Sequence, residues 1–387
     1  MTAPAPGPAH TPHIARLDVL RALAFLAVFT SHMTGPFVVF KPLWQGWWRD
    51  YSHCPPVLYP IMAISEGWLG VPLFFVLSGF CIHYSTMKRA PKEAFRTGDF
   101  YWRRFLRIYP AYFVCVLICT ALAPWLSPKY FNGWQVITHL LMIHNFIKMT
   151  FGGLNGPLWS LGVESQFYLL YPFLLLFMRR RLSWGQCLGV ALVFNSVLQI
   201  YFCLTSQPYE LTHTRPTFSF PLVTWCDWIL GAALAESYVE GRRLFTRPAL
   251  WLIGSALMVV LALNFRLLFV QGYLFGSVFF AVMMQQYLAW RTPLAWVERA
   301  LAPIGLISYS LYLWHVPVLS LVEMWGHSLG LDATPLLFAA WNAALASAVV
   351  FPLAWLSYRT LETAVPKWLA TVAKKKRASA TANAAAS

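Results

Sequence analysis

The chain has 387 residues, of which 58% are hydrophobic and only 11% are charged. Roughly a quarter of the residues in soluble domains are charged, so this composition excludes an ordinary soluble protein and predicts a polytopic membrane protein. The formal net charge is +15, but the basic residues lie in short clusters between apolar stretches rather than on one soluble face. We therefore expect the charge to reflect membrane topology and expect no nucleic-acid partner.

The N-terminal segment, residues 1–13, is rich in Pro and Ala, and we expect it to be disordered. A cleaved signal peptide is the alternative, but no convincing small-residue cleavage site follows, which favours an uncleaved signal anchor. The seven cysteines are an odd number without paired metal-ligand spacing. We interpret them as packing residues and expect no metal site.

Ten apolar stretches are long enough to cross about 30 Å of hydrocarbon. We therefore predict an all-α helical bundle of about ten transmembrane helices over residues 14–365, followed by a basic cytosolic tail, 366–387. A shorter segment at 134–149, which contains His139 and His144, is typical of an interfacial or re-entrant helix. The ten stretches lie near 14–34, 66–84, 103–124, 157–178, 183–204, 220–238, 249–265, 269–290, 301–325 and 334–358.

The basic residues indicate the orientation of these helices. With the N-terminus in the cytosol and ten crossings, 23 of the 29 Lys and Arg residues fall on the cytosolic side and six fall outside. Such an excess of positive charge is typical of cytosolic loops, so we predict that both termini are cytosolic.

The first apolar stretch contains Arg21 and His32, which are eleven residues apart. This offset corresponds to about 1100°, within roughly 20° of three helical turns, and to about 16 Å of rise. The two side chains therefore share one helix face, and Asp18 lies close to that face. Ionisable groups inside a membrane usually face a protein interior or a watery cavity, so we interpret this stripe as a functional site.

His32 and Glu164 are the candidate catalytic residues. A neutral imidazole at residue 32 is able to accept a proton from a hydroxyl, although a helix-packing histidine is the alternative. Glu164 follows Asn155 in the sequence NGPLWSLGVESQFYLLYP, about seven residues into the fourth stretch, where an unpaired carboxylate is costly. A structural carboxylate between helices is the alternative there. Both residues fall towards the outer half or the middle of the membrane, which permits them to meet.

Three arginines stand at the cytosolic start of the third stretch, in the sequence FYWRRFLRIYPAYF. Arg104 and Arg107 form an i, i+3 pair, and Arg103 and Arg107 form an i, i+4 pair. Guanidinium groups suit phosphate oxygens, so these residues are candidates for binding a nucleotide-bearing donor. Ordinary positive-inside arginines are the alternative interpretation.

Two further stretches, GVPLFFVLSGFCIHYS at 70–85 and GLISYSLYLWHVP at 305–317, combine small residues, hydroxyls and a histidine. Close helix packing explains most of the small residues, while His83 and His315 stay ambiguous. The residues that we expect to bind substrates are Arg21, Asp18, Arg103, Arg104, Arg107, Ser78 and His315.

Taken together, these segments resemble acyltransferase family 3, the integral-membrane O-acyltransferases of bacterial cell-surface and secondary-metabolite chemistry. The five matching segments occur in the family's order: RLDVLRALAFLAVFTSH, GVPLFFVLSGF, YWRRFLRIYP, GPLWSLGVESQFYLLYP and ISYSLYLWHVP. On this resemblance the family's essential arginine and histidine fall on Arg21 and His32, its intramembrane glutamate on Glu164, and its arginine motif on Arg104 and Arg107.

The resemblance implies an enzyme of the cytoplasmic (inner) membrane that O-acetylates a hydroxyl of a sugar, a polysaccharide unit or another membrane-delivered acceptor. It implies acyl-CoA, commonly acetyl-CoA, as co-substrate rather than a tightly bound cofactor, and glycan-assembly proteins as partners. The chain departs from the family pattern at Ser165, where relatives often carry a second glutamate, and at Pro72, where many carry an aspartate. The hydrolase-like domain of some members is absent from this sequence.

Two mechanisms are open: His32 acts as a general base on the acceptor hydroxyl, or a histidine or serine becomes acylated. A glycolipid or polysaccharide-precursor transporter or flippase is the alternative function, although the sequence shows no internal repeat of the kind that marks many transporters. A non-enzymatic membrane scaffold is a further alternative, but it would not require this concentration of charge on helix faces, so the sequence disfavours it.

Overall fold

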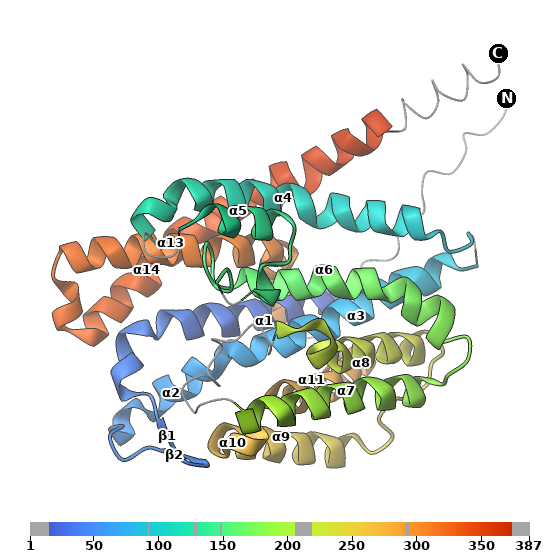
Figure 1. Ribbon diagram of the computed structural model, residues 1–387, viewed down its shortest axis with the longest axis horizontal. Helices are drawn as coiled ribbons and strands as arrows, with labels where there is room; N and C mark the ends of the chain where they lie inside the picture. The colour runs from blue at the N-terminus through green and yellow to red at the C-terminus, as the bar shows by residue number, and fades with distance from the viewer. Residues whose placement is uncertain are drawn as a thin grey trace.

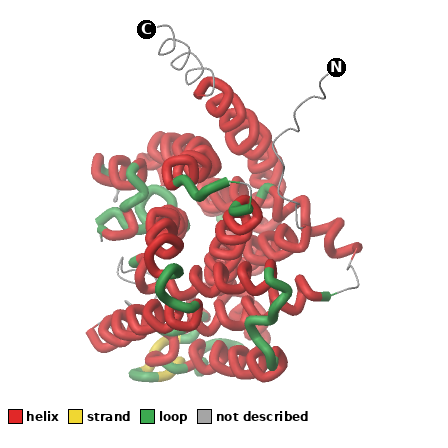
Figure 2. Tube along the Cα trace, turned by 90° about the vertical axis from the view of Figure 1, so that its right-hand side faces the viewer, coloured by secondary structure: helices red, strands yellow, loops and turns green. Residues whose placement is uncertain are grey.

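The computed structural model describes residues 15–91, 93–126, 131–147, 149–205, 219–290 and 295–373. The predicted disordered segment 1–13 and residues 374–387 of the predicted basic tail lie outside the described residues. Nearly all of the described chain is helical, as Figure 2 shows, which confirms the all-α class.

Each of the ten predicted apolar stretches coincides with a helix. Backbone groups inside hydrocarbon must bond within their own segment, so apolar stretches of this length form helices. Proline, which fits the first helical turn, begins three of them at Pro221, Pro248 and Pro335. The ten helices are α1 (Ala15–Met33), α3 (Gly70–Arg89), α4 (Thr97–Leu126), α6 (Leu158–Phe173), α7 (Trp184–Thr205), α8 (Pro221–Val239), α9 (Pro248–Asn264), α11 (Gly272–Ala289), α13 (Ser308–Ser328) and α14 (Pro335–Ser357).

The ninth predicted stretch is broken near Ile307, where α12 (Ala295–Leu306) meets α13 at an angle of 67°. Two helices continue as π-helical segments: α6 into η5 (Leu174–Met178) and α14 into η9 (Tyr358–Ala364). In the described part of the chain, five helical runs are long and apolar enough to cross a membrane, or six if the bent pair counts as one span. The five runs are Pro56–Arg89, Thr97–Leu126, Leu158–Met178, Trp184–Phe202 and Pro335–Ala373.

Short elements connect the long helices. The 134–149 region forms α5 (Gly133–Leu140) and η4 (His144–Phe146), and the Asn132 side chain caps α5 by accepting a hydrogen bond from the Gln135 backbone N–H at 3.1 Å. A small antiparallel hairpin, which the sequence analysis did not predict, joins β1 (Leu43–Gln45) and β2 (Trp48–Asp50). The remaining short elements are η1 (Gly35–Phe40), η2 (Pro56–Leu58), α2 (Tyr59–Ser65), η3 (Glu66–Leu69), α10 (Arg266–Phe269) and η8 (Leu331–Ala333).

Helices α1 and α3 run through the middle of the bundle, between a group formed by α4, α13 and α14 and a group formed by α7, α8, α9 and α11 (Figure 1). The α3–α8 contact is the most extensive in the bundle. It depends on two small residues, because an added Cβ at Gly79 would lie 2.0 Å from the Trp228 carbonyl oxygen and one at Gly231 would lie 2.0 Å from the Val76 carbonyl oxygen. Glycine therefore permits the two backbones to approach.

We predict that Gly231→Ala destabilises the protein, because the new methyl group overlaps backbone rather than a flexible side chain. The expected cost is about 1–3 kcal/mol, typical of an overpacked core. Gly254→Ala is the matched control, since an added Cβ there meets nothing within 4 Å and helix propensity favours alanine. Melting curves of both purified variants test this. Equal melting temperatures would show that the α3–α8 contact tolerates separation.

Candidate active site

A cavity of about 150 Å³ lies where α1, α3, α4, α6 and α13 meet. It collects polar side chains from all five sequence segments that carry the family resemblance, although these segments are far apart in the chain. Its polar lining residues are Arg21, Ser78, Cys81, Arg104, Arg107, Ser160, Glu164, Tyr168, Ser308, Tyr309 and Tyr312.

Glu164 is held in this cavity by hydroxyl groups. Ser78 Oγ donates a hydrogen bond to Glu164 Oε1 at 2.6 Å, and Tyr168 OH, one helical turn further along α6, donates to the same oxygen at 2.5 Å. Trp228 Nε1 donates to Ser78 Oγ at 3.2 Å and so fixes the serine. Both partners of Oε1 are neutral, and Glu164 Oε2 makes no hydrogen bond to any described residue. The carboxylate therefore keeps an oxygen with which it can accept a proton or a hydrogen bond in the cavity.

Arg21 and Asp18 form an ion pair on α1, as their spacing predicts, and the Asp18 side chain is buried. Arg21 also donates to Cys81 Sγ on α3 at 3.0 Å. Asp18 itself is not among the cavity-lining residues. Its carboxylate stabilises the positive charge of Arg21 at the wall of the cavity.

Arg104 and Arg107 reach the cavity from α4 in different environments. Arg104 stacks on the Phe100 ring, 5.7 Å from its centroid, and its Nε is buried without a hydrogen-bond partner among the described residues. The Arg107 side chain is half exposed, and its Nη1 lies 3.7 Å from Glu362 Oε2. The cavity thus contains positive groups that suit an anionic ligand.

Arg103 lines a different and smaller cavity, of about 40 Å³. Arg89 and Arg96 also line this second cavity, and Arg104 forms part of both cavities. The structure therefore separates Arg103 from Arg107, although the two are one helical turn apart.

His32 does not line the cavity that contains Glu164. Its Nδ1 donates to the Val28 carbonyl oxygen at 2.9 Å, and its ring centroid lies 5.1 Å from that of His315 on α13. His315 is fully buried, its Nδ1 donates to the Tyr312 carbonyl oxygen at 2.8 Å, and its Nε2 has no hydrogen-bond partner among the described residues. The structure thus pairs His32 with His315 and not with Glu164.

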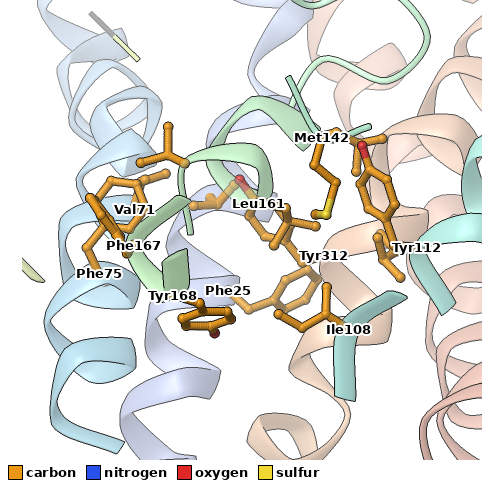
Figure 3. Close-up of a cluster of buried hydrophobic side chains, with 14 of the residues drawn as sticks. Phe25, Val71, Phe75, Ile108, Tyr112, Met142, Leu161, Phe167, Tyr168 and Tyr312 are labelled. Atoms are coloured by element: carbon orange, nitrogen blue, oxygen red, sulfur yellow. The ribbon is translucent and has the colours of Figure 1, made fainter. Parts of the chain in front are cut away.

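Tyr312 connects the two groups of polar residues. Its ring lies 5.4 Å from His315, its hydroxyl hydrogen-bonds Ser160 Oγ at 2.7 Å, and it lines the cavity. Figure 3 shows it in one cluster of buried side chains that also contains Phe25 of α1 and Tyr168 of α6. Tyr312 was not among the site residues predicted from the sequence, although its position three residues before His315 places both on one helix face.

Three other histidines that the sequence analysis discussed, His83, His139 and His144, do not line the cavity. His83 hydrogen-bonds Tyr171 OH at 3.0 Å and Glu236 Oε2 at 3.1 Å, which is a satisfied buried network outside the cavity. The rings of His139 and His144 stack at 3.9 Å, and burial lowers the pKa of His139 to about 4, so this imidazole is neutral at pH 7. No group of three or more metal-ligating side chains occurs in the part of the chain that the structure describes.

Comparisons with known proteins identify the family to which the chain is similar. A family model described as an acyltransferase domain matches residues 14–359. The chain is 26% identical over 92% of its length to peptidoglycan O-acetyltransferase OatA of Listeria monocytogenes, of which it covers 56%. It is also 26% identical over 81% of its length to the putative peptidoglycan O-acetyltransferase YrhL of Bacillus subtilis, of which it covers 49%.

A third relative is the acyltransferase MdmB of Streptomyces mycarofaciens, which is 28% identical over 65% of this chain and of which 64% is covered. The chain thus spans about half to two thirds of the length of these curated relatives. No solved structure matches it. Because the family model matches nearly the whole chain, the protein belongs to acyltransferase family 3.

Proposed function

We propose that this protein is a membrane O-acyltransferase that transfers an acyl group, commonly acetyl, from acyl-CoA to a hydroxyl of a glycan or of another membrane-delivered acceptor. The observation that carries the proposal is the convergence of Glu164, Arg21, Arg104 and Arg107 on one cavity inside an apolar bundle. Charged groups are costly inside an apolar bundle, so their presence there indicates a functional site. The O-acetyltransferases among the relatives support the reaction class.

The membrane topology that we propose has ten spans with both termini in the cytosol. In this orientation the arginines of α4 lie near the cytosolic face, where acyl-CoA is present. His32, at the other end of α1 from Arg16, lies towards the outer face. The roughly 16 Å of rise between Arg21 and His32 suits an extended pantetheine arm that carries its thioester away from the phosphates.

In the proposed reaction the acceptor oxygen forms an ester bond with the thioester carbonyl carbon, the C–S bond breaks, and coenzyme A leaves as a thiolate that receives the proton taken up by His32. His32 takes the hydroxyl proton as general base, since a neutral imidazole has a free nitrogen while its Nδ1–H is bonded to Val28. His315 shares this site, and Glu164 orients groups on the cavity side of Tyr312. Acceptors in cell-envelope glycan assembly would reach His32 from the outer half of the bundle.

We predict that a cysteine introduced at Ser52 is labelled by a membrane-impermeant maleimide in intact cells and that one at Arg243 is not. Both residues are exposed, and the 23-to-6 partition of basic residues places them on opposite sides. Both cysteines should react after lysis, in a background without native cysteines. The reverse pattern would overturn the topology and the direction of donor entry.

We predict that His32→Ala and Glu164→Gln each reduce acyl transfer by roughly a hundredfold or more, as expected for loss of a proton-transferring group. Membrane insertion and yield should stay near wild type. Glu323→Gln is a control carboxylate outside the cavity and should leave transfer unchanged. Mass spectrometry of acetylated products from variant strains provides the measurement. Near-normal transfer by either site variant would remove that residue from the mechanism.

We predict that Arg107→Lys weakens acyl-CoA binding while leaving the topology unchanged. Lysine keeps the positive charge but loses the planar fork that binds phosphate oxygens in pairs. Arg359→Lys, an exposed arginine that stacks on Trp355, is the control and should bind as wild type does. Titration of purified proteins with coenzyme A decides the matter. Equal affinity of all three proteins would show that Arg107 does not bind the donor and contributes only to membrane topology.

A further inference from the structure

A buried carboxylate that does not line the active-site cavity, Glu362, lies beside one of its lining residues, Arg107. It lies in the π-helical segment η9 that follows α14, and its side chain is 0% exposed. Its local sequence, YRTLET at 358–363, is a mixed basic and polar segment after the last apolar stretch, so composition alone does not mark it as a site residue. π-Helical turns often mark functional sites, since they shift side chains away from their regular helical positions.

One oxygen of Glu362 is fixed by a serine. Ser310 Oγ donates to Glu362 Oε1 at 2.5 Å, and it also lies 2.9 Å from Ser357 Oγ, which joins α13 to the end of α14. Glu362 Oε2 is buried without a hydrogen-bond partner among the described residues. A buried carboxylate in this state needs a nearby positive charge.

That charge is Arg107, whose Nη1 lies 3.7 Å from Glu362 Oε2. The two side chains differ in freedom, because the carboxylate is enclosed whereas half of the Arg107 side chain is exposed. An arginine has five N–H donors, so an attraction at Nη1 leaves the other donors available to a ligand. The buried carboxylate thus lies beside a half-exposed guanidinium that also lines the cavity.

We propose that Glu362 is a positioning residue that holds Arg107 in the orientation in which its guanidinium meets a phosphate of the acyl donor. This inference rests on the proposed function, in which that donor is acyl-CoA. Two other possible roles of Glu362 predict different effects of its removal on anion binding. If Glu362 mainly neutralised Arg107, its removal would strengthen the binding of an anion. If it only tied η9 to α13, its removal would lower stability and leave binding unchanged.

The test is titration of the purified full-length protein with coenzyme A, which avoids the need to know the acceptor. Glu362→Gln keeps the volume and the hydrogen bond from Ser310 but removes the charge. We expect it to weaken the Kd by about three- to tenfold, the cost of ordering one long side chain on binding. Glu362→Asp keeps the charge and should recover most of the affinity. Glu323 is a carboxylate on a different helix, α13, and Glu323→Gln should bind coenzyme A as wild type does.

A double-mutant cycle shows whether Glu362 acts through Arg107. The Glu362→Gln/Arg107→Lys protein should bind coenzyme A no more weakly than Arg107→Lys alone. Once Arg107 is replaced, Glu362 has no guanidinium to orient, so its own replacement costs no further affinity. If Glu362→Gln does not fold, Ser310→Ala releases the carboxylate and should weaken the Kd in the same direction. Melting temperatures of all variants separate binding effects from general destabilisation.

The outcomes distinguish this inference from the function on which it rests. If wild-type protein does not bind coenzyme A, the proposed donor is wrong and the role of Glu362 is wrong with it. If wild type binds and Arg107→Lys weakens the Kd, but Glu362→Gln binds equally or more tightly, only the positioning role is overturned. Multiplicative losses in the double variant would also overturn it, since they would show that the two residues act independently.

Discussion

The cost of placing charge in an apolar bundle constrains this protein more than any other interaction. Three carboxylates at or beside the cavity have defined partners: Asp18 pairs with Arg21, Glu164 accepts from two hydroxyls, and Glu362 faces Arg107. These partners belong to different helices in two of the three cases. The bundle can therefore contain these charges only if its helices pack in one arrangement.

The close packing of α3 on α8 has a direct consequence for the site. Gly79, at the contact, is next to Ser78, which binds Glu164. Trp228, whose carbonyl oxygen Gly79 approaches, donates its indole N–H to the same serine. Small residues at this crossing thus determine where a hydrogen-bond donor of Glu164 stands. Helix packing and site geometry cannot be changed separately here.

The polar residues form two groups on either side of Tyr312. The group with Glu164 and the arginines lines a cavity, whereas His32 and His315 lie against each other among aromatic rings. In the proposed reaction, a donor held by the arginines and an acceptor hydroxyl near His32 would meet at the level of Tyr312. Such a separation suits a reaction in which the two substrates approach from opposite faces of a membrane.

The sequence by itself determined where the helices lie, because an apolar backbone must satisfy its hydrogen bonds within its own segment. It also singled out Arg21, Glu164, Arg104 and Arg107, which the structure brings to one cavity, because charge is rare and costly in such segments. Tertiary structure alone decided their partners: that His32 meets His315 rather than Glu164, that Arg103 leaves the main cavity, and that the ninth stretch bends near Ile307. These pairings depend on how helices distant in sequence pack, which local composition does not encode.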